Sequence, residues 1–263
     1  MRTRIYAALN GIPLNSLDSA IVIQGVDEAA PNWNISAGNR AGLTGQIVLS
    51  TEKRYRDVKI SFAIAEKHDL IHRAQILQQV NAWAAGGGVL EVGYRPGQLL
   101  RVICAGLPEI KTLTKWAEAY SITFRAYEVP FWVSAVEESV SVAATSSGSG
   151  ALAVTGTAGG KLCFTATNGT SSSCATVSVS ANGATMAFSS LGLAAGEKLI
   201  VDYDERDLQR IRIQASGGTL RSVMDKRTVE SADDIPLLCG GNMITVTAQQ
   251  NLTWKLYTIG RWE

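Results

Sequence analysis

One stretch of helical periodicity stands in a chain whose other segments alternate like β-strands. Apolar residues recur there at the spacing of one helix face, at Leu70, Ala74, Leu77, Val80 and Ala84. Asp69 precedes them as a typical N-cap and glycines at 86–88 stop the pattern, so a helix over 69–85 is predicted. Strand-like runs follow at 89–94, 99–107 and 119–129. A long helix covering a sheet is typical of an α+β domain.

The composition changes between residues 130 and 136. Beyond this point Ser, Thr, Gly and Ala dominate, and turn residues separate short strand-like runs about every 8–12 residues. This spacing predicts an antiparallel β-sandwich. We therefore expect a mainly β chain with an α+β N-terminal domain over residues 1–134 and a C-terminal sandwich over residues 135–263.

Charged residues are scarce, at 18% of the chain against roughly 25% in ordinary soluble domains. Either part of the surface is buried against other copies or partners, or the surface is polar without charge. The net charge of +1 gives no electrostatic reason to expect nucleic-acid binding. No apolar run approaches the roughly 18 residues of a membrane span, and the N-terminus lacks a signal-peptide pattern. The chain is therefore expected to stay in the cytoplasm in which it is made.

Two segments of the N-terminal half carry clusters of polar residues. Residues 29–44 combine a proline, asparagines and turn-prone positions, which predicts a long loop of the kind that is functional or that a partner orders. Residues 46–64 have the pattern of two strands with a basic segment, Lys53 to Arg56, at the bend between them. Such a cluster is more often a solvated hairpin tip than a binding patch.

Motifs for catalysis, cofactors or metals are sparse. His68 and His72 have the i,i+4 spacing that can bind zinc on a helix, but no third ligand lies nearby in sequence, so two exposed polar residues are expected. No serine lies in a nucleophile-elbow motif, and histidines confined to one helix leave little room for a triad. We predict no enzyme activity, no cofactor and no metal site, and the composition favours a structural or interaction protein.

Two further groupings have structural explanations. If Asn168-Gly169 forms a two-residue hairpin turn, Cys163 and Cys174 face each other across it and are expected to stay reduced as packing residues. Four carboxylates lie between two strand-like runs, at Asp202, Asp204, Glu205 and Asp207. Calcium prefers such oxygen ligands, but no glycine supplies the sharp turn and Arg206 interrupts the group, so a solvated turn is favoured.

Three stretches carry a resemblance to a known family. The helix with its following strand has the sequence RAQILQQVNAWAAGGGVLEV, and the last strand before the composition change is SITFRAYEVPFWVSA. The third stretch is AAGEKLIVDYDERDLQRIRI, running on to IPLLCGGNMITVTA. In this order they resemble the distal tail proteins, within the phage tail family, of bacteriophages or prophages with long non-contractile tails. The resemblance spans nearly the whole chain and rests on structural patterns, with no catalytic signature.

The resemblance implies a tail-tube-like N-terminal β domain that closes into a homo-hexameric ring, and a galectin-like C-terminal β-sandwich. Such a ring is a hub that joins the tail tube to the tail tip or baseplate. The implied partners are the tail tube protein, the tail-tip or tail-associated protein, the end of the tape-measure protein and receptor-binding proteins. The implied location is the virion tail, assembled in the cytoplasm of the host bacterium.

The loop 29–44 and the basic segment are then candidates either for contacts between subunits or for the lining of the lumen. The candidate contact residues are Trp33, Asn34, Asn39, Arg40, Lys53, Arg54 and Arg56. Two other classes stay open. One is a carbohydrate-binding module that recognises the host wall, although the paired pattern of sugar-binding galectins is absent from residues 135–263 and aromatic residues there are few. The other is a tail-tip hydrolase, which no acid pair at suitable spacing supports.

Overall fold

The computed structural model describes residues 5–39, 44, 46–65, 70–108 and 118–263. The chain divides into two compact units. Unit 1 comprises Met1–Val133 together with Glu263, and unit 2 comprises Ser134–Trp262. The chain therefore leaves unit 1 once and returns to it with its final residue.

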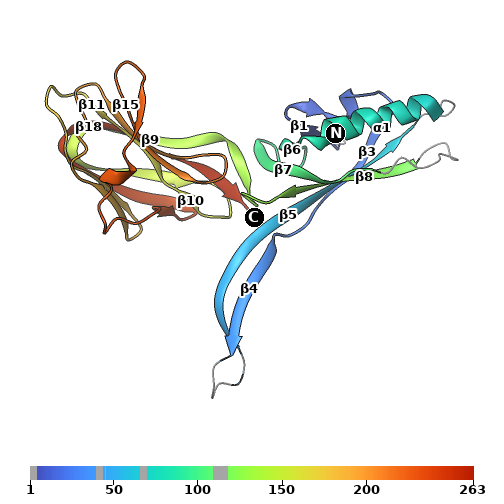
Figure 1. The fold of residues 1–263 in the computed structure, drawn as a ribbon, viewed down its shortest axis with the longest axis horizontal. Helices are drawn as coiled ribbons and strands as arrows, with labels where there is room; N and C mark the ends of the chain where they lie inside the picture. The colour runs from blue at the N-terminus through green and yellow to red at the C-terminus, as the bar shows by residue number, and fades with distance from the viewer. Residues whose placement is uncertain (1–4, 40–43, 45, 66–69, 109–117) are drawn as a thin grey trace. The chain divides into compact units, whose positions relative to one another are not determined.

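Unit 1 is built on an antiparallel sheet (Figure 1). Its strands, in spatial order, are β3 (Ile21–Glu28), β5 (Gln46–Ile64), β8 (Glu118–Ala126) and β7 (Gln98–Gly106). A second row continues from β7 through β6 (Gly88–Val92), β1 (Ala7–Leu9) and β2 (Ile12–Pro13), followed by the 3-10 helix η1 (Leu14–Ser16). Alternate residues of the central strands are buried, among them Ile60 and Ile122, which oppose each other in register. This alternation is expected of a sheet with one covered face.

Helix α1 (Leu70–Ala85) covers the buried face of this sheet. Trp83 lies edge-on to Phe124 of β8, with ring centroids 5.9 Å apart and an interplanar angle of 80°. The helix ends at the predicted glycines, because Gly87 has φ +60° and a Cβ atom there would lie 2.5 Å from the carbonyl oxygen of Val102. The predicted N-cap, Asp69, is outside the described residues.

The predicted apolar stripe of α1 is correct for Leu77, Val80 and Ala84 and wrong at its first turn. Arg73 and Ile76 complete the buried face, whereas Leu70 is 58% exposed. Leu70 lies at nearly the same angle around the helix as Leu77, since seven residues are close to two turns. Its exposure therefore means that the first turn of α1 extends past the sheet that covers the later turns.

Two predictions for the N-terminal half are wrong. Within the expected loop of residues 29–44, β4 (Asn32–Asn39) is a strand, and the basic segment Lys53 to Arg56 lies inside the continuous strand β5 and not at a bend. β4 pairs with the first part of β5, from Gln46 to Tyr55, while the later part pairs with β3 and β8. β4 and the first part of β5 form a two-stranded ribbon, which we call the arm (Figure 1). Cross-strand pairing has overridden the local turn propensity of asparagine and glycine.

Unit 2 is an antiparallel β-sandwich. One sheet runs through β16 (Leu220–Ser222), β15 (Gln209–Gln214), β14 (Lys198–Tyr203), β11 (Cys163–Asn168) and the second half of β18 (Gly240–Trp262). The first half of β18 pairs with β12 (Val177–Ala181), which pairs with β13 (Ala184–Phe188). β9 (Trp132–Val154) also lies beside β18. The remaining elements are β10 (Gly160–Lys161), β17 (Pro236–Leu237) and the 3-10 helix η2 (Met224–Lys226).

Strand β18 joins the two sheets. The strand-like runs 243–248 and 252–259, which the spacing of turn residues predicts as two of the short strands, belong to this one strand. Its inward residues are buried in the common core, at Ile244, Val246, Leu252, Trp254 and Leu256. The predicted mainly β architecture with one long helix is confirmed for the part of the chain that the structure describes.

The predicted hairpin at Asn168-Gly169 is wrong. Asn168 is buried and its Nδ2 donates to the carbonyl oxygens of Ser172 and Leu193, both at 2.8 Å, so its side chain organises a longer loop after β11. Cys163 lies opposite Tyr257 in the register, and both it and Cys174 are buried free thiols. Burial raises the pKa of Cys163 to about 12, which disfavours the reactive thiolate.

Candidate functional site

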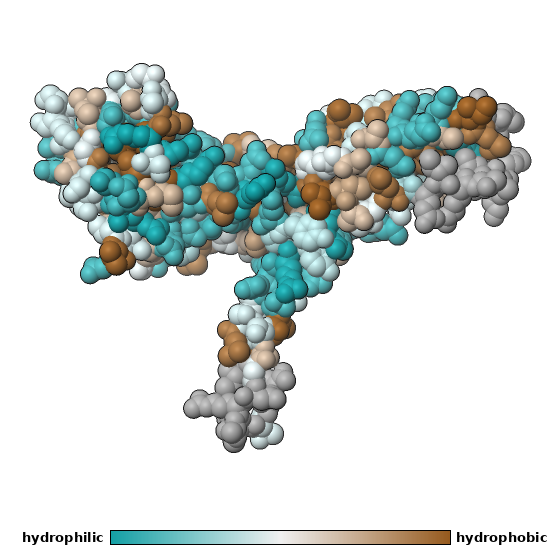
Figure 2. Space-filling view, in the orientation of Figure 1, coloured by the Kyte–Doolittle hydropathy of each residue, from teal (hydrophilic) through white to brown (hydrophobic). Residues whose placement is uncertain are grey.

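The arm presents apolar side chains to solvent, mainly on one face, while Leu49, 68% exposed, lies beside Gly38 on the other face. Its register pairs Trp33 with Lys53 and Ala37 with Val48, and Ile35 lies between them on the same side. Trp33, Ile35 and Val48 are 52%, 60% and 58% exposed, and we call these three residues the arm stripe. Figure 2 shows hydrophobic surface along the arm beyond its hydrophilic base. Large apolar side chains thus stand in solvent on a narrow element.

The arm also has an open edge. β4 pairs with β5 and with no other strand of the described chain, so its second edge carries unpaired backbone groups. An isolated two-stranded ribbon is marginally stable in water, and an open edge is a template for another strand. An exposed apolar stripe beside an open edge is typical of a surface that another chain covers.

Stacked side chains fix the base of the arm. The Lys53 ammonium lies 4.8 Å from the ring centroids of both Trp33 and Phe131, and it pairs with the Glu263 carboxylate. Cation–π contacts of this kind contribute roughly 0.5–2 kcal/mol each. Lys53 therefore holds Trp33 in a defined orientation where the arm begins.

A buried charge cluster lies where β3 ends and the arm joins the sheet. Glu28 accepts hydrogen bonds from Arg56, from Nε and Nη2 of Arg95 at 2.8 and 3.0 Å, from the Tyr94 hydroxyl at 3.1 Å and from Trp132 Nε1 at 2.9 Å. We call these five residues the Glu28 cluster. One carboxylate thereby connects β3, β5, the turn after β6 and the start of β9.

Arg56 is the most buried charged member of the cluster, at 1% exposed. Its Nε and Nη2 atoms have no hydrogen-bond partner in the described chain. Burial lowers the pKa of Arg56, against the opposing charge of Glu28. Burial, reinforced by Glu28, also raises the pKa of Tyr94 to about 12. The Glu28 carboxylate is thus the group that compensates a buried guanidinium.

The predicted subunit-contact residues fall into two environments. Trp33, Asn34, Lys53 and Arg54 lie on the paired strands of the arm, and Asn39 ends β4. Arg56 is buried in the Glu28 cluster. Arg40 is not among the described residues. Their role as contacts between subunits stays a prediction.

Sequence reasoning missed Ile35, Val48 and Glu28. The alternation of Trp33, Ile35 and Ala37 was a usable strand signal, but the surrounding proline, asparagines and glycines outweighed it. Glu28 has no local signal, because its partners Arg56 and Trp132 are 28 and 104 residues away in the chain.

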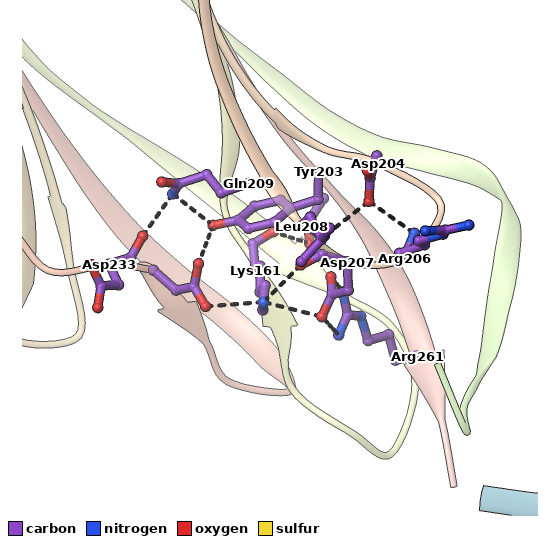
Figure 3. A network of polar contacts seen from close by, with 11 residues as sticks. Lys161, Tyr203, Asp204, Arg206, Asp207, Leu208, Gln209, Asp233 and Arg261 are labelled. Atoms are coloured by element: carbon purple, nitrogen blue, oxygen red, sulfur yellow. Dashed lines mark hydrogen bonds and ion pairs between the residues drawn. The ribbon is translucent and has the colours of Figure 1, made fainter. Parts of the chain in front are cut away.

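The acidic turn of unit 2 is a network of ion pairs (Figure 3). Asp207 lies 2.6 Å from Arg261 Nη2 and 3.0 Å from Lys161 Nζ, which also pairs with Asp234 at 2.9 Å. Asp204 accepts hydrogen bonds from two backbone N–H groups of its own turn, at 2.9 and 3.0 Å. The predicted turn between β14 and β15 is therefore present, with Glu205 and Arg206 exposed at its tip, and the Asp207 carboxylate fixes it to β18.

A second polar grouping surrounds Tyr257 on the outer face of the β14–β11–β18 sheet. Asp202 lies 2.6 Å from Arg212 Nη2, Glu137 pairs with Lys255, and Lys255 Nζ lies 5.0 Å from the Tyr257 ring centroid. Burial is the main cause of the raised pKa of Tyr257. An aromatic ring with fixed polar groups around it can bind a saccharide. Sequence reasoning missed this grouping because its members come from distant strands.

His72 Nε2 lies 3.3 Å from Asp18, and His68 falls outside the described ranges. Within those ranges, no set of His, Cys, Asp and Glu side chains is arranged to hold a metal ion. No helix that the structure describes is both long and apolar enough to cross a membrane.

No protein-family model and no curated protein sequence matches this chain. The crystal structure of the Dit protein of phage SPP1, described as a paradigm of the hub adsorption apparatus in phages that infect Gram-positive bacteria, is similar with a TM-score of 0.73. That match has 12% sequence identity and covers 98% of this chain and 99% of that chain.

Two structures of the phage p2 baseplate in its activated conformation, with Sr and with Ca, each give a TM-score of 0.46. Their identities are 10% and 8%, and they cover 96% and 92% of this chain and 97% and 90% of the matched chains. At such low identity the SPP1 match establishes the architecture. This chain has the fold of a phage Dit protein over nearly its whole length.

Proposed function

We propose that this protein is a distal tail protein, a non-catalytic ring hub at the tip of a phage tail. The arm is the observation that carries the proposal. It combines the exposed arm stripe with an open strand edge on a fold shared with the SPP1 Dit protein. Exposed apolar side chains and unpaired backbone groups both cost free energy in water. A second chain that covers the arm would bury these side chains and pair these backbone groups.

In a closed ring, the chain that covers each arm is another copy of the same protein. A cyclic oligomer needs two different complementary patches on each subunit, and the arm supplies one of them on unit 1. The arm stripe would dock on the body of the neighbouring unit 1, so that each subunit gives one arm and receives one. A homo-hexamer is the ring size that the family resemblance implies.

The remaining roles follow from that hub. Residues 1–134 form the ring, and residues 135–263 are an appended sandwich. The ring joins the tail tube to the tail-tip or host-adhesion apparatus, with the tube protein, the tail-tip or tail-associated protein, the tape-measure end and receptor-binding proteins as its partners. The hub belongs to the virion tail and is assembled in the host cytoplasm.

Replacing Trp33 and Ile35 together by serine is expected to weaken self-association at least about tenfold. Large aromatic and aliphatic anchors dominate the binding energy of an interface, and both side chains are already in solvent in the single chain. Native mass spectrometry and light scattering over a range of protein concentrations measure the change. The free energy of unfolding should fall by no more than about 2 kcal/mol, the size of the Lys53–Trp33 contact that the substitution removes.

The matched control is Val22→Ser. Val22 is an apolar side chain that is 51% exposed on β3, outside the arm, so the control should leave the oligomer intact. A parent chain that stays monomeric at high concentration and fails to bind the tail tube protein of its own phage would refute the hub.

The Tyr257 grouping supports a second candidate, saccharide binding by unit 2 at the host wall. Replacing Tyr257 by alanine should then reduce retention on purified wall fragments by about tenfold, because an aromatic contact contributes roughly 0.5–1.5 kcal/mol beyond the area that it buries. Ser180→Ala, on the outer face of the other sheet, is the control. A parent chain that shows no retention on wall fragments or on a glycan array removes this candidate without affecting the hub.

A further inference from the structure

The arm and both chain connections to unit 2 reach the Glu28 cluster within unit 1. The chain leaves unit 1 after Val133, next to the fully buried Trp132, and returns at Glu263. Trp132 Nε1 donates to Glu28 at 2.9 Å, and Arg95 Nη2 donates to the Glu263 carbonyl oxygen at 3.4 Å. Arg56 binds the same Glu28 carboxylate from the base of the arm.

We propose that the Glu28 cluster is an anchor that couples the arm to the outgoing and returning connections of the chain. Loosening any one of these three segments then loosens the other two. A contact that orders the arm would thereby also order the two chain segments that connect unit 1 to unit 2. This inference concerns a single chain and does not depend on the ring.

Two features of the cluster support coupling over independent local contacts. The first feature is a shared acceptor. Arg56, Arg95 and Trp132 all donate hydrogen bonds to the carboxylate of Glu28, whose side chain is 14% exposed. Donors that share a buried acceptor polarise and position one another, so their contributions are not additive. The second is the ring of Trp132, which lies 5.3 Å from the Arg95 guanidinium carbon and so touches the cluster by stacking as well as by its N–H group.

Hydrogen exchange of the full chain with Glu28→Gln tests the anchor. The amide keeps the size of the carboxylate and removes its charge. Exchange at 53–57, at 132–134 and at 262–263 should rise together by roughly tenfold or more, while β11, β14 and β15 stay unchanged. An increase confined to β3 and β5, with 132–134 as slow as in the parent, would overturn the anchor.

A milder variant keeps the test decisive if Glu28→Gln unfolds unit 1. Trp132→Phe removes the Nε1 donor and retains an aromatic ring, so it perturbs the outgoing connection directly. The anchor requires faster exchange at 53–57, although these residues are far from Trp132 in sequence. Unchanged exchange there would refute the coupling.

Asp57→Asn is the matched control. Asp57 follows Arg56 on β5 and points to the opposite face of the strand. Its carboxylate accepts hydrogen bonds from Nε and Nη2 of Arg125 at 2.5 and 2.7 Å. Its substitution also breaks an arginine pair on β5, but it should speed exchange near β8 and leave 132–134 and 262–263 unchanged. Equal effects of Asp57→Asn and Glu28→Gln at the connections would show general loosening of the sheet and contradict the proposal.

Discussion

Replacing Phe164 by alanine is expected to lower the free energy of unfolding of unit 2 by about 3–5 kcal/mol. Phe164 is fully buried on β11, between β14 and β18. Its ring centroid lies 6.4 Å from that of Phe188 and 6.5 Å from that of Trp254, so the side chain joins the two sheets of the sandwich. Truncation would remove apolar contact and leave a cavity that the strand backbones cannot close.

Denaturant unfolding of the full chain, followed by circular dichroism and by hydrogen exchange of the strands of unit 2, measures this loss. Thr165→Ala is the control, because Thr165 is the next residue of β11 and points to the half-exposed outer face. It should change stability by less than about 1 kcal/mol. A Phe164→Ala loss no larger than that of the control would mean that the core is not organised around this ring.

The strands of unit 2 could be predicted because their signals are local. Residues 198–203 are rich in β-branched and aromatic residues and residues 210–213 alternate Arg with Ile, and turn residues bound both runs. β9 and β18 are the exceptions. In β9 the Ser-Gly run 146–150 resembles a loop but lies inside one continuous strand. Gln249 and Asn251 resemble a turn, but the N–H of Gln249 binds the Thr176 carbonyl oxygen and the strand continues from one sheet to the other. Only the tertiary pairing distinguishes that continuation from a turn.

The arm could not be predicted from local propensity. Asn32, Asn34 and Asn39 favour turns in isolation, and the sequence offers no hydrophobic face that belongs to a core. The pairing of β4 with β5 supplies the order instead, through a register with two irregularities. The prediction of a solvated hairpin tip at the basic residues of β5 was also wrong, because Lys53 and Arg56 contact residues distant in sequence.

The sequence therefore predicted the position of the candidate site but not the apolar character of its surface. Trp33 and Lys53 were singled out from the sequence, and they do lie together on the arm. The sequence drew attention to polar and basic residues, whereas Ile35 and Val48 provide the exposed apolar surface. Glu28 could not be found at all, because a carboxylate at the end of a strand is ordinary until distant donors converge on it.

Replacing Glu28 by alanine is expected to destabilise unit 1 by about 3–5 kcal/mol, since it would leave a buried charge without its partner. Arg56 is 1% exposed, and its remaining guanidinium atoms have no acceptor in the described structure. Asp27→Ala is the control, because Asp27 precedes Glu28 on β3 and is exposed. That control should cost less than about 1 kcal/mol.

The double variant separates uncompensated charge from lost packing. Adding Arg56→Met to Glu28→Ala removes the buried charge and keeps an apolar side chain of similar length, so part of the lost stability should return. Unfolding curves of the parent, both single variants and the double variant give the coupling energy between the two positions. Simple additivity of the two single losses would show that Glu28 acts through Arg95, Tyr94 and Trp132 and that Arg56 does not need its charge. If the double variant recovers at least about 1 kcal/mol of the free energy of unfolding lost in Glu28→Ala, the Glu28–Arg56 pair is a main source of stability at the base of the arm.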